Sequence, residues 1–65
     1  MTKTYEMKEY KVTINYHTQR SNLVKVYRAS GNNEEVAKRL SLGTLLLDEI
    51  KRYIKIDSVI VEEVQ

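Results

Sequence analysis

Apolar and polar residues alternate most regularly between residues 9 and 17. The apolar positions are Tyr10, Val12, Ile14 and Tyr16, and the residues between and beside them are polar. Because successive side chains of a strand point to opposite faces of a sheet, this period of two predicts a strand with one buried face and one open face. Valine, isoleucine, threonine and tyrosine also favour strands.

Two further strands are expected. One runs from Leu23 to Ala29, after a polar segment at residues 18–22 that suits a hairpin loop. Apolar residues fall on both of its faces, and we expect Val24 and Val26 to face the core. The other runs from Ile56 to Val64. It places Val59 and Val61 on one face, and Ile56, Ile60 and Val64 on the other.

Between these two strands the apolar period changes to that of a helix. Asn32 has Glu35 three residues later, which is the spacing of an N-cap with its capping-box acid, so the helix is expected to begin near Asn33. Positions 36, 40, 43, 47, 50 and 54 fall within one narrow arc. This pattern favours a single helix to about residue 54, straight or kinked at Gly43. Two short helices separated at Gly43 are the alternative.

The order β-β-α-β predicts a small α+β domain. A short loop makes the first two strands antiparallel, and the helix returns the chain over one face of the sheet as a right-handed connection. The expected product is a three-stranded antiparallel or mixed sheet in the order 2-1-3, with one long or kinked helix on one face. Residues 8–65 are expected to form this single domain, and residues 1–7 a flexible N-terminal arm.

The helical segment carries more apolar residues than one small core needs. We expect the core stripe to consist of Val36, Leu40, Leu47, Ile50 and Ile54. The surplus residues are predicted to form a protein interface, since exposed apolar patches indicate interaction sites; they are Leu42, Leu45, Leu46 and Tyr53. A homodimer is the favoured use of this surface, ahead of docking on another protein. A third possibility is that the arm covers the surplus with Tyr5 and Met7.

Composition narrows the class of protein. The chain of 65 residues has no cysteine and one histidine, so disulfides and multi-histidine zinc sites are excluded. The first residues contain no apolar segment that would predict a signal peptide. The longest apolar run, residues 45–47, is too short to span a membrane. The cytoplasm is therefore the expected location.

The sequence contains no recognisable catalytic motif. His17 is the only side chain whose ordinary pKa lies near neutrality, and Ser21 and Ser58 lack the context of an activated nucleophile. With only two glycines there is no phosphate-binding loop. Adjacent acidic residues point in different directions along a helix or strand. We expect a protein that is not an enzyme and that has no catalytic residues, cofactor, metal or small-molecule substrate.

Nucleic-acid binding on the open face of the sheet is the alternative function. Its candidate residues are Lys11, His17, Arg20, Lys25 and Tyr27. Basic and aromatic side chains on an open sheet can contact phosphates and stack on bases. A shift of one residue in the second strand would turn Tyr27 into the core and remove this surface. The formal net charge of only +2 is also low for a dedicated nucleic-acid binder.

In composition alone, the chain resembles the small accessory proteins of bacteria and their phages. It is short, has no cysteine or proline, and is rich in lysine and asparagine. That resemblance implies an inhibitor or regulator that covers the surface of a host factor. The leading hypothesis is thus a non-enzymatic protein-interaction module that self-associates or docks on a protein partner through an apolar helix surface.

Overall fold

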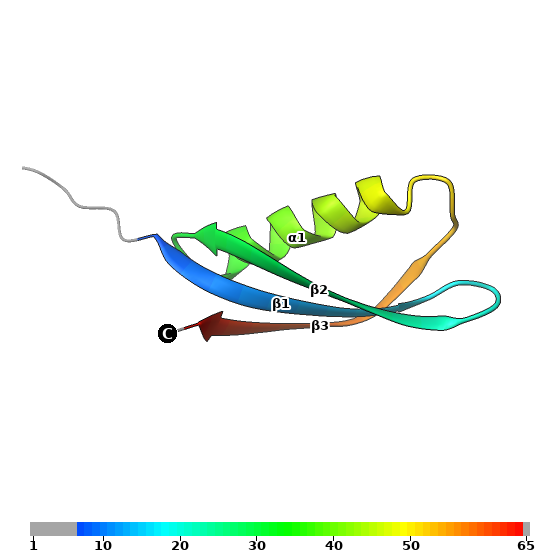
Figure 1. Cartoon of the computed structure of the whole chain (residues 1–65), viewed down its shortest axis with the longest axis horizontal. Coiled ribbons are helices and arrows are strands. Elements are labelled where there is room, and N and C mark those ends of the chain that lie inside the picture. The colour runs from blue at the N-terminus through cyan, green and yellow to red at the C-terminus, as the bar shows by residue number, and fades with distance from the viewer. Residues whose placement is uncertain (1–6, 65) are drawn as a thin grey trace, which may run out of the picture.

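The computed structural model describes residues 7–64, which form three strands and one helix (Figure 1). The elements are β1 (Lys8–His17), β2 (Asn22–Gly31), α1 (Glu34–Asp48) and β3 (Lys55–Val64). The strands form one antiparallel sheet in the order β2-β1-β3, and α1 lies along one face of it. The predicted α+β class, strand order and helix position are confirmed. The expected arm lies outside the described residues, except for the exposed Met7.

The central strand β1 supplies most of the core. Its four apolar side chains, Tyr10, Val12, Ile14 and Tyr16, are all buried, as the alternating pattern predicts. Ala37 and Leu45 of α1 complete the set of buried apolar residues. A strand between two others and beneath a helix loses most of its solvent contact on one face, which explains the regular alternation in its sequence.

The buried face of β2 is the opposite of the one expected. Val12 pairs with Tyr27, and Tyr16 pairs with Leu23. Directly opposed residues of antiparallel strands point to the same face, so Tyr27 and Leu23 lie on the helix side and pack against the core. Val24 and Val26 are exposed on the open face. The expectation is wrong because residues 18–21 form a four-residue loop, whose length decides which set of alternate residues faces inward.

Strand β3 changes register near its start. Asn15 pairs with Ser58 but Tyr16 pairs with Ile56, which leaves Asp57 as the extra residue of a bulge. Val59 and Val61 pack against the core, as their shared face predicts. Ile56 was expected on the opposite face from these valines. The bulge instead places it across from the inward-facing Tyr16.

Helix α1 begins one residue later than the capping pattern suggests. The N-cap is Asn33, not Asn32, and its side-chain oxygen accepts a hydrogen bond of 3.0 Å from the backbone N–H of Val36. The helix enters close to the end of β2. A Cβ atom on Gly31 would lie only 2.9 Å from Cγ1 of Val36, so a residue without a side chain permits this approach.

The helix continues through Gly43 without a break but ends at Asp48. The single helix is therefore confirmed, whereas its expected extension to residue 54 is wrong. The backbone N–H of Glu49 donates to Leu45 at 2.9 Å, and that of Arg52 donates to Glu49 at 3.0 Å. These bonds close a turn that brings the chain back toward the sheet.

The inner face of α1 is not the predicted stripe. Its buried residues are Ala37, Ser41 and Leu45. The first two are small, which lets the helix lie close to the sheet. Of the expected core stripe only Ile54 packs against the core, and the others are exposed: Val36, Leu40, Leu47 and Ile50. The Ser41 hydroxyl is buried without a hydrogen-bond partner among the described residues.

Candidate functional site

The side of α1 that faces away from the core carries large apolar side chains. We call this surface the outer apolar face, formed by Val36, Leu40, Leu46 and Leu47. Their exposed fractions are 38, 53, 57 and 71%, respectively. Gly43 lies between them on the helix surface, and a Cβ atom built there meets nothing within 4 Å. The backbone of α1 is thus accessible at the centre of the face.

The four predicted interface residues do not share one surface. Leu45 is fully buried in the core, which contradicts its expected exposure. Leu42 is half-buried and packs against the core. Leu46 and Tyr53 are exposed, but Tyr53 lies beyond the end of α1. The assignment fails for Leu45 because the inner face of the helix is centred on small residues, which a search for large apolar residues overlooks.

The predicted nucleic-acid surface is divided between the two faces of the sheet. Lys11 and His17 lie on the open face, whereas Lys25 and Tyr27 pair with the inward-facing Ile14 and Val12 and lie on the helix side. Arg20 lies in the hairpin loop. The observed register of β2 turns Tyr27 toward the helix side, which removes it from the predicted surface.

Tyr27 instead links β2 to the end of the helix. Its hydroxyl donates a hydrogen bond of 2.8 Å to Oδ2 of Asp48. Burial of the phenol, followed by this bond and the negative charge of Asp48, raises the pKa of Tyr27 to about 12. Burial and the nearby charge of Glu49 also raise the pKa of Tyr16. Both tyrosines are held in their neutral forms.

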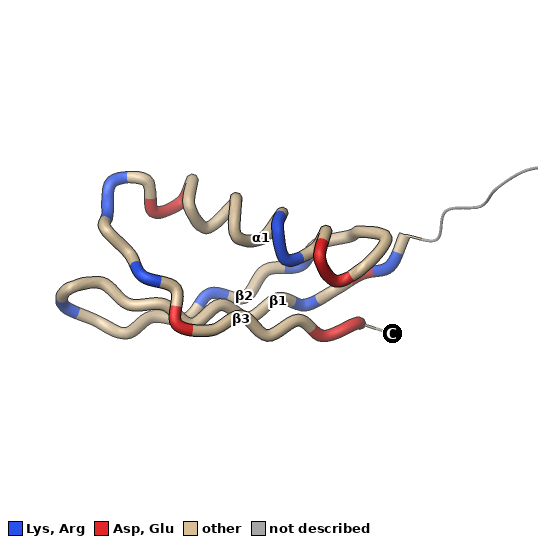
Figure 2. The backbone as a smooth tube through the Cα atoms, turned by 180° about the vertical axis from the view of Figure 1, so that it is seen from behind, with Lys and Arg blue, Asp and Glu red and all other residues tan. Residues whose placement is uncertain are grey.

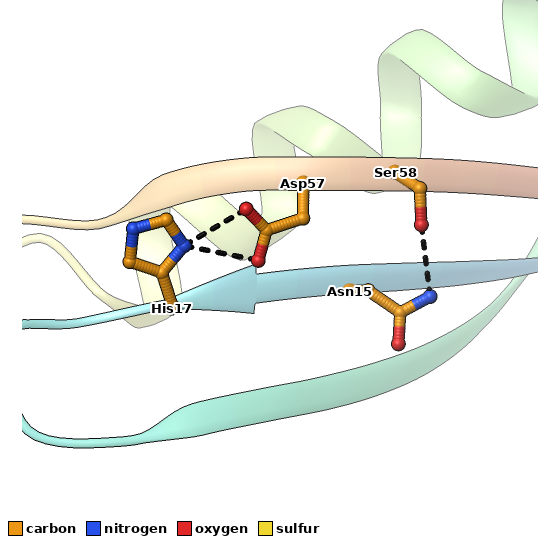
Figure 3. Close-up of polar contacts among 4 residues, drawn as sticks. All are labelled: Asn15, His17, Asp57 and Ser58. Carbon is orange, nitrogen blue, oxygen red and sulfur yellow. Dashed lines mark hydrogen bonds and ion pairs between the residues drawn. The ribbon is translucent and has the colours of Figure 1, made fainter.

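The open face carries two polar pairs near the bulge (Figure 3). Nδ1 of His17 lies 2.8 and 3.0 Å from the two carboxylate oxygens of Asp57. The side-chain amide of Asn15 donates to Oγ of Ser58 at 3.0 Å. Ser58 lies on the far side of Asp57 from His17, and the other ring nitrogen of His17 points away from it. The arrangement therefore lacks the histidine–hydroxyl contact of a catalytic triad.

A polar cleft lies between the hairpin loop and the turn that follows α1. Its larger cavity, of about 410 Å³, is lined by Thr18, Gln19, Arg20, Ser21, Arg52 and Tyr53. An adjoining cavity of about 220 Å³ is lined by His17, Thr18, Gln19, Tyr53 and Lys55. At this end of the molecule, Lys and Arg segments lie on the hairpin loop, on the turn and at the start of β3, with acidic segments at the end of α1 and in β3 (Figure 2). Sequence reasoning named Arg20, His17 and Tyr53, but for two different surfaces.

Two kinds of site find no candidate within residues 7–64. No three or more histidine or acidic side chains come close enough together there to hold a metal ion. No helix in this range is both long and apolar enough to cross a membrane.

Comparison of the chain with protein-family models, with curated proteins and with solved structures finds no match.

Proposed function

We propose that this chain is a non-enzymatic protein-interaction module that self-associates through the outer apolar face. The observation that carries the proposal is the exposure of four large apolar side chains on one helix, two of whose three buried residues, Ala37 and Ser41, are small. Exposed apolar side chains on one side of a helix are typical of an interaction site. A cytoplasmic location and a bacterial or phage origin, both suggested by composition, fit the proposal but are not needed for it.

The pattern of α1 favours a second copy of the chain as the partner. Two helices packed antiparallel about Gly43 would place Leu40 of one copy level with Leu46 of the other. A two-fold interface requires such self-complementarity. The missing side chain at Gly43 would allow close contact between the two helices.

The energies predict a weak dimer. Complete burial of one leucine or valine side chain contributes about 1.5–3 kcal/mol. Four half-exposed side chains from each copy would together contribute roughly 6–12 kcal/mol, which is comparable to the cost of about 4–15 kcal/mol for lost rotation and translation. We therefore expect an association that dilution reverses.

The test is the solution mass, measured by light scattering over a dilution series at low and high salt. The wild-type chain should approach twice its 7.7 kDa mass at high concentration, with little change on added salt. Leu40→Glu should remain monomeric with an unchanged circular dichroism spectrum. Val26→Glu is the matched control, because Val26 and Leu40 are both 53% exposed but only Leu40 is on the helix.

Two results would contradict the proposal. A wild-type chain that stays monomeric at every concentration would exclude self-association. Dissociation by Val26→Glu but not by Leu40→Glu would move the interface to the open face of the sheet.

A further inference from the structure

The polar cleft is lined by basic side chains and by no acidic ones. At the opposite end of the sheet, Arg28 contacts Glu9 at 2.6 Å and Lys8 contacts Glu63 at 3.7 Å. No acidic residue lines either cavity of the cleft. Among the described residues, Arg20 and Lys55 form no ion pair.

The charge of Arg52, which also lines the cleft, is only partly neutralised. Arg52 reaches one oxygen of Glu49 through a single nitrogen, at 3.5 Å. His17 contacts Asp57 through Nδ1. Two arginines from separate loops therefore line one cavity with a surplus of positive charge, and guanidinium groups are well suited to phosphate because of their planar sets of donors.

Local hydrogen bonds hold both walls of the cleft. In the hairpin loop, Oγ1 of Thr18 accepts bonds of 3.2 Å from the backbone N–H groups of Arg20 and Ser21. The backbone N–H of Thr18 donates to Ser21 at 2.9 Å. On the other wall, the bond from Arg52 to Glu49 closes the turn. An ordered wall reduces the entropy that a ligand must overcome on binding.

An aromatic ring stands where the two cavities meet. Tyr53 lines both of them and is 75% exposed. An exposed ring beside cationic groups is the arrangement by which proteins stack a base while they hold its phosphate. Neither the core nor the outer apolar face uses this side chain.

We propose that the cleft binds a nucleotide unit, with its phosphate held by Arg20 and Arg52 and its base stacked on Tyr53. The unit could be a free nucleotide or one residue of a single-stranded nucleic acid, since both present the same phosphate and base. This proposal uses different residues from the helix interface and stands without it.

The experiment is a titration of the full chain, followed by two-dimensional NMR of the backbone amides. The probes are uridine monophosphate, uridine, inorganic phosphate and a short oligouridine. Uridine monophosphate should shift the amides of residues 17–21 and 52–55, and should bind more tightly than uridine or phosphate alone. Tighter binding of oligouridine would identify a single strand as the source, and equal binding would identify the free nucleotide.

Substitutions test the role that we propose for each side chain of the cleft. Arg20→Ala and Arg52→Ala should each weaken uridine monophosphate about tenfold, the loss expected for one charged hydrogen bond. Tyr53→Leu should weaken uridine monophosphate but not inorganic phosphate. Lys38→Ala is the control, because it removes one positive charge outside the cleft and should leave binding unchanged. Arg20 and Tyr53 are exposed and form no ion pair among the described residues, so the melting temperature of their variants should not move. Arg52→Ala also removes the cation that pairs with the mostly buried Glu49, and it should lower the melting temperature.

Three results would overturn the proposal. The first is an absence of amide shifts in the cleft with millimolar uridine monophosphate. The second is an equal loss of affinity in Lys38→Ala and Arg20→Ala, which would indicate attraction by net charge alone. The third is a phosphoserine peptide that binds as tightly as uridine monophosphate and is insensitive to Tyr53→Leu, which would exclude base stacking.

Discussion

The two sides of helix α1 do not differ as hydrophobicity alone would predict. The inner side presents Ala37, Ser41 and Leu45, and the outer side presents larger apolar residues that remain exposed. Ala37 and Leu45 share one core cluster with the two buried tyrosines of β1, Tyr10 and Tyr16. Small residues fit against such a surface, because interiors are close-packed. The orientation of the helix thus follows from shape rather than from the amount of apolar surface on each side.

The largest expected difference between the two sides is in the stability lost when one leucine on each side is replaced by alanine. Leu45→Ala leaves a cavity in the core and should lower the free energy of unfolding by about 3 kcal/mol. Leu47→Ala removes the same atoms from an exposed position and should change it by less than about 0.5 kcal/mol. Urea denaturation of dilute protein measures both values. Equal losses would show that the outer side is also part of the folding core.

A smaller loss of stability is expected when a contact that holds the helix in this orientation is removed. Tyr27→Phe removes the hydrogen bond to Asp48 at the end of α1 and should cost about 1 kcal/mol near neutral pH. The pKa of Tyr27 is raised from 10.0 to about 12 in the folded chain, so the unfolded chain loses this proton first as pH rises. The free energy of unfolding should therefore fall between pH 10 and pH 12.

That decline should be shallower in Tyr27→Phe, although not absent, because the pKa of Tyr16 is raised as well. Denaturation at several pH values compares the two chains. Parallel profiles would mean that Tyr27 ionises equally well in the folded and unfolded states, and that its bond to Asp48 does not fix the helix.

The smallest effects are gains in stability, one from each side of the helix. Ser41→Ala removes a buried hydroxyl that has no partner among the described residues, and should raise the free energy of unfolding by about 1 kcal/mol. Gly43→Ala should raise it by a similar or smaller amount, about 0.5–1 kcal/mol, because alanine favours helices and its methyl group meets open space. Thermal unfolding of dilute protein can resolve both.

Ser41→Ala and Gly43→Ala should differ in their effect on stability once the chain forms a dimer. The methyl group of Gly43→Ala would stand at the centre of the proposed helix pair and weaken the dimer, whereas Ser41→Ala would not. A loss of stability in Ser41→Ala would instead reveal a partner for the hydroxyl.

The fold could be predicted because its signals are local. A few neighbouring residues are enough to predict β1 from its alternation, the hairpin loop from its polar segment, and the N-terminal end of the helix from its cap. The buried face of β2 could not be predicted in this way, because it depends on the exact pairing of His17 with Asn22 across the loop. The inner side of α1 was missed because two of its residues are small.

The candidate sites were harder to predict because they depend on tertiary structure. Asp57 meets His17 only because a bulge shifts the pairing of β3. The polar cleft exists only because the hairpin loop and the turn after α1 meet, although Arg20 and Tyr53 lie far apart in sequence. The periodicity of the sequence does not show which distant segments come into contact.

The central position of β1 also imposes an order on folding. Its residues pair with β2 across a loop of four residues, but Glu9 pairs with Val64, at the other end of the chain. Loop closure becomes more costly as the separation along the chain grows. We therefore expect the β1–β2 hairpin to form before β3 docks. Until β3 docks, β1 exposes an unpaired edge that a strand of another chain can occupy.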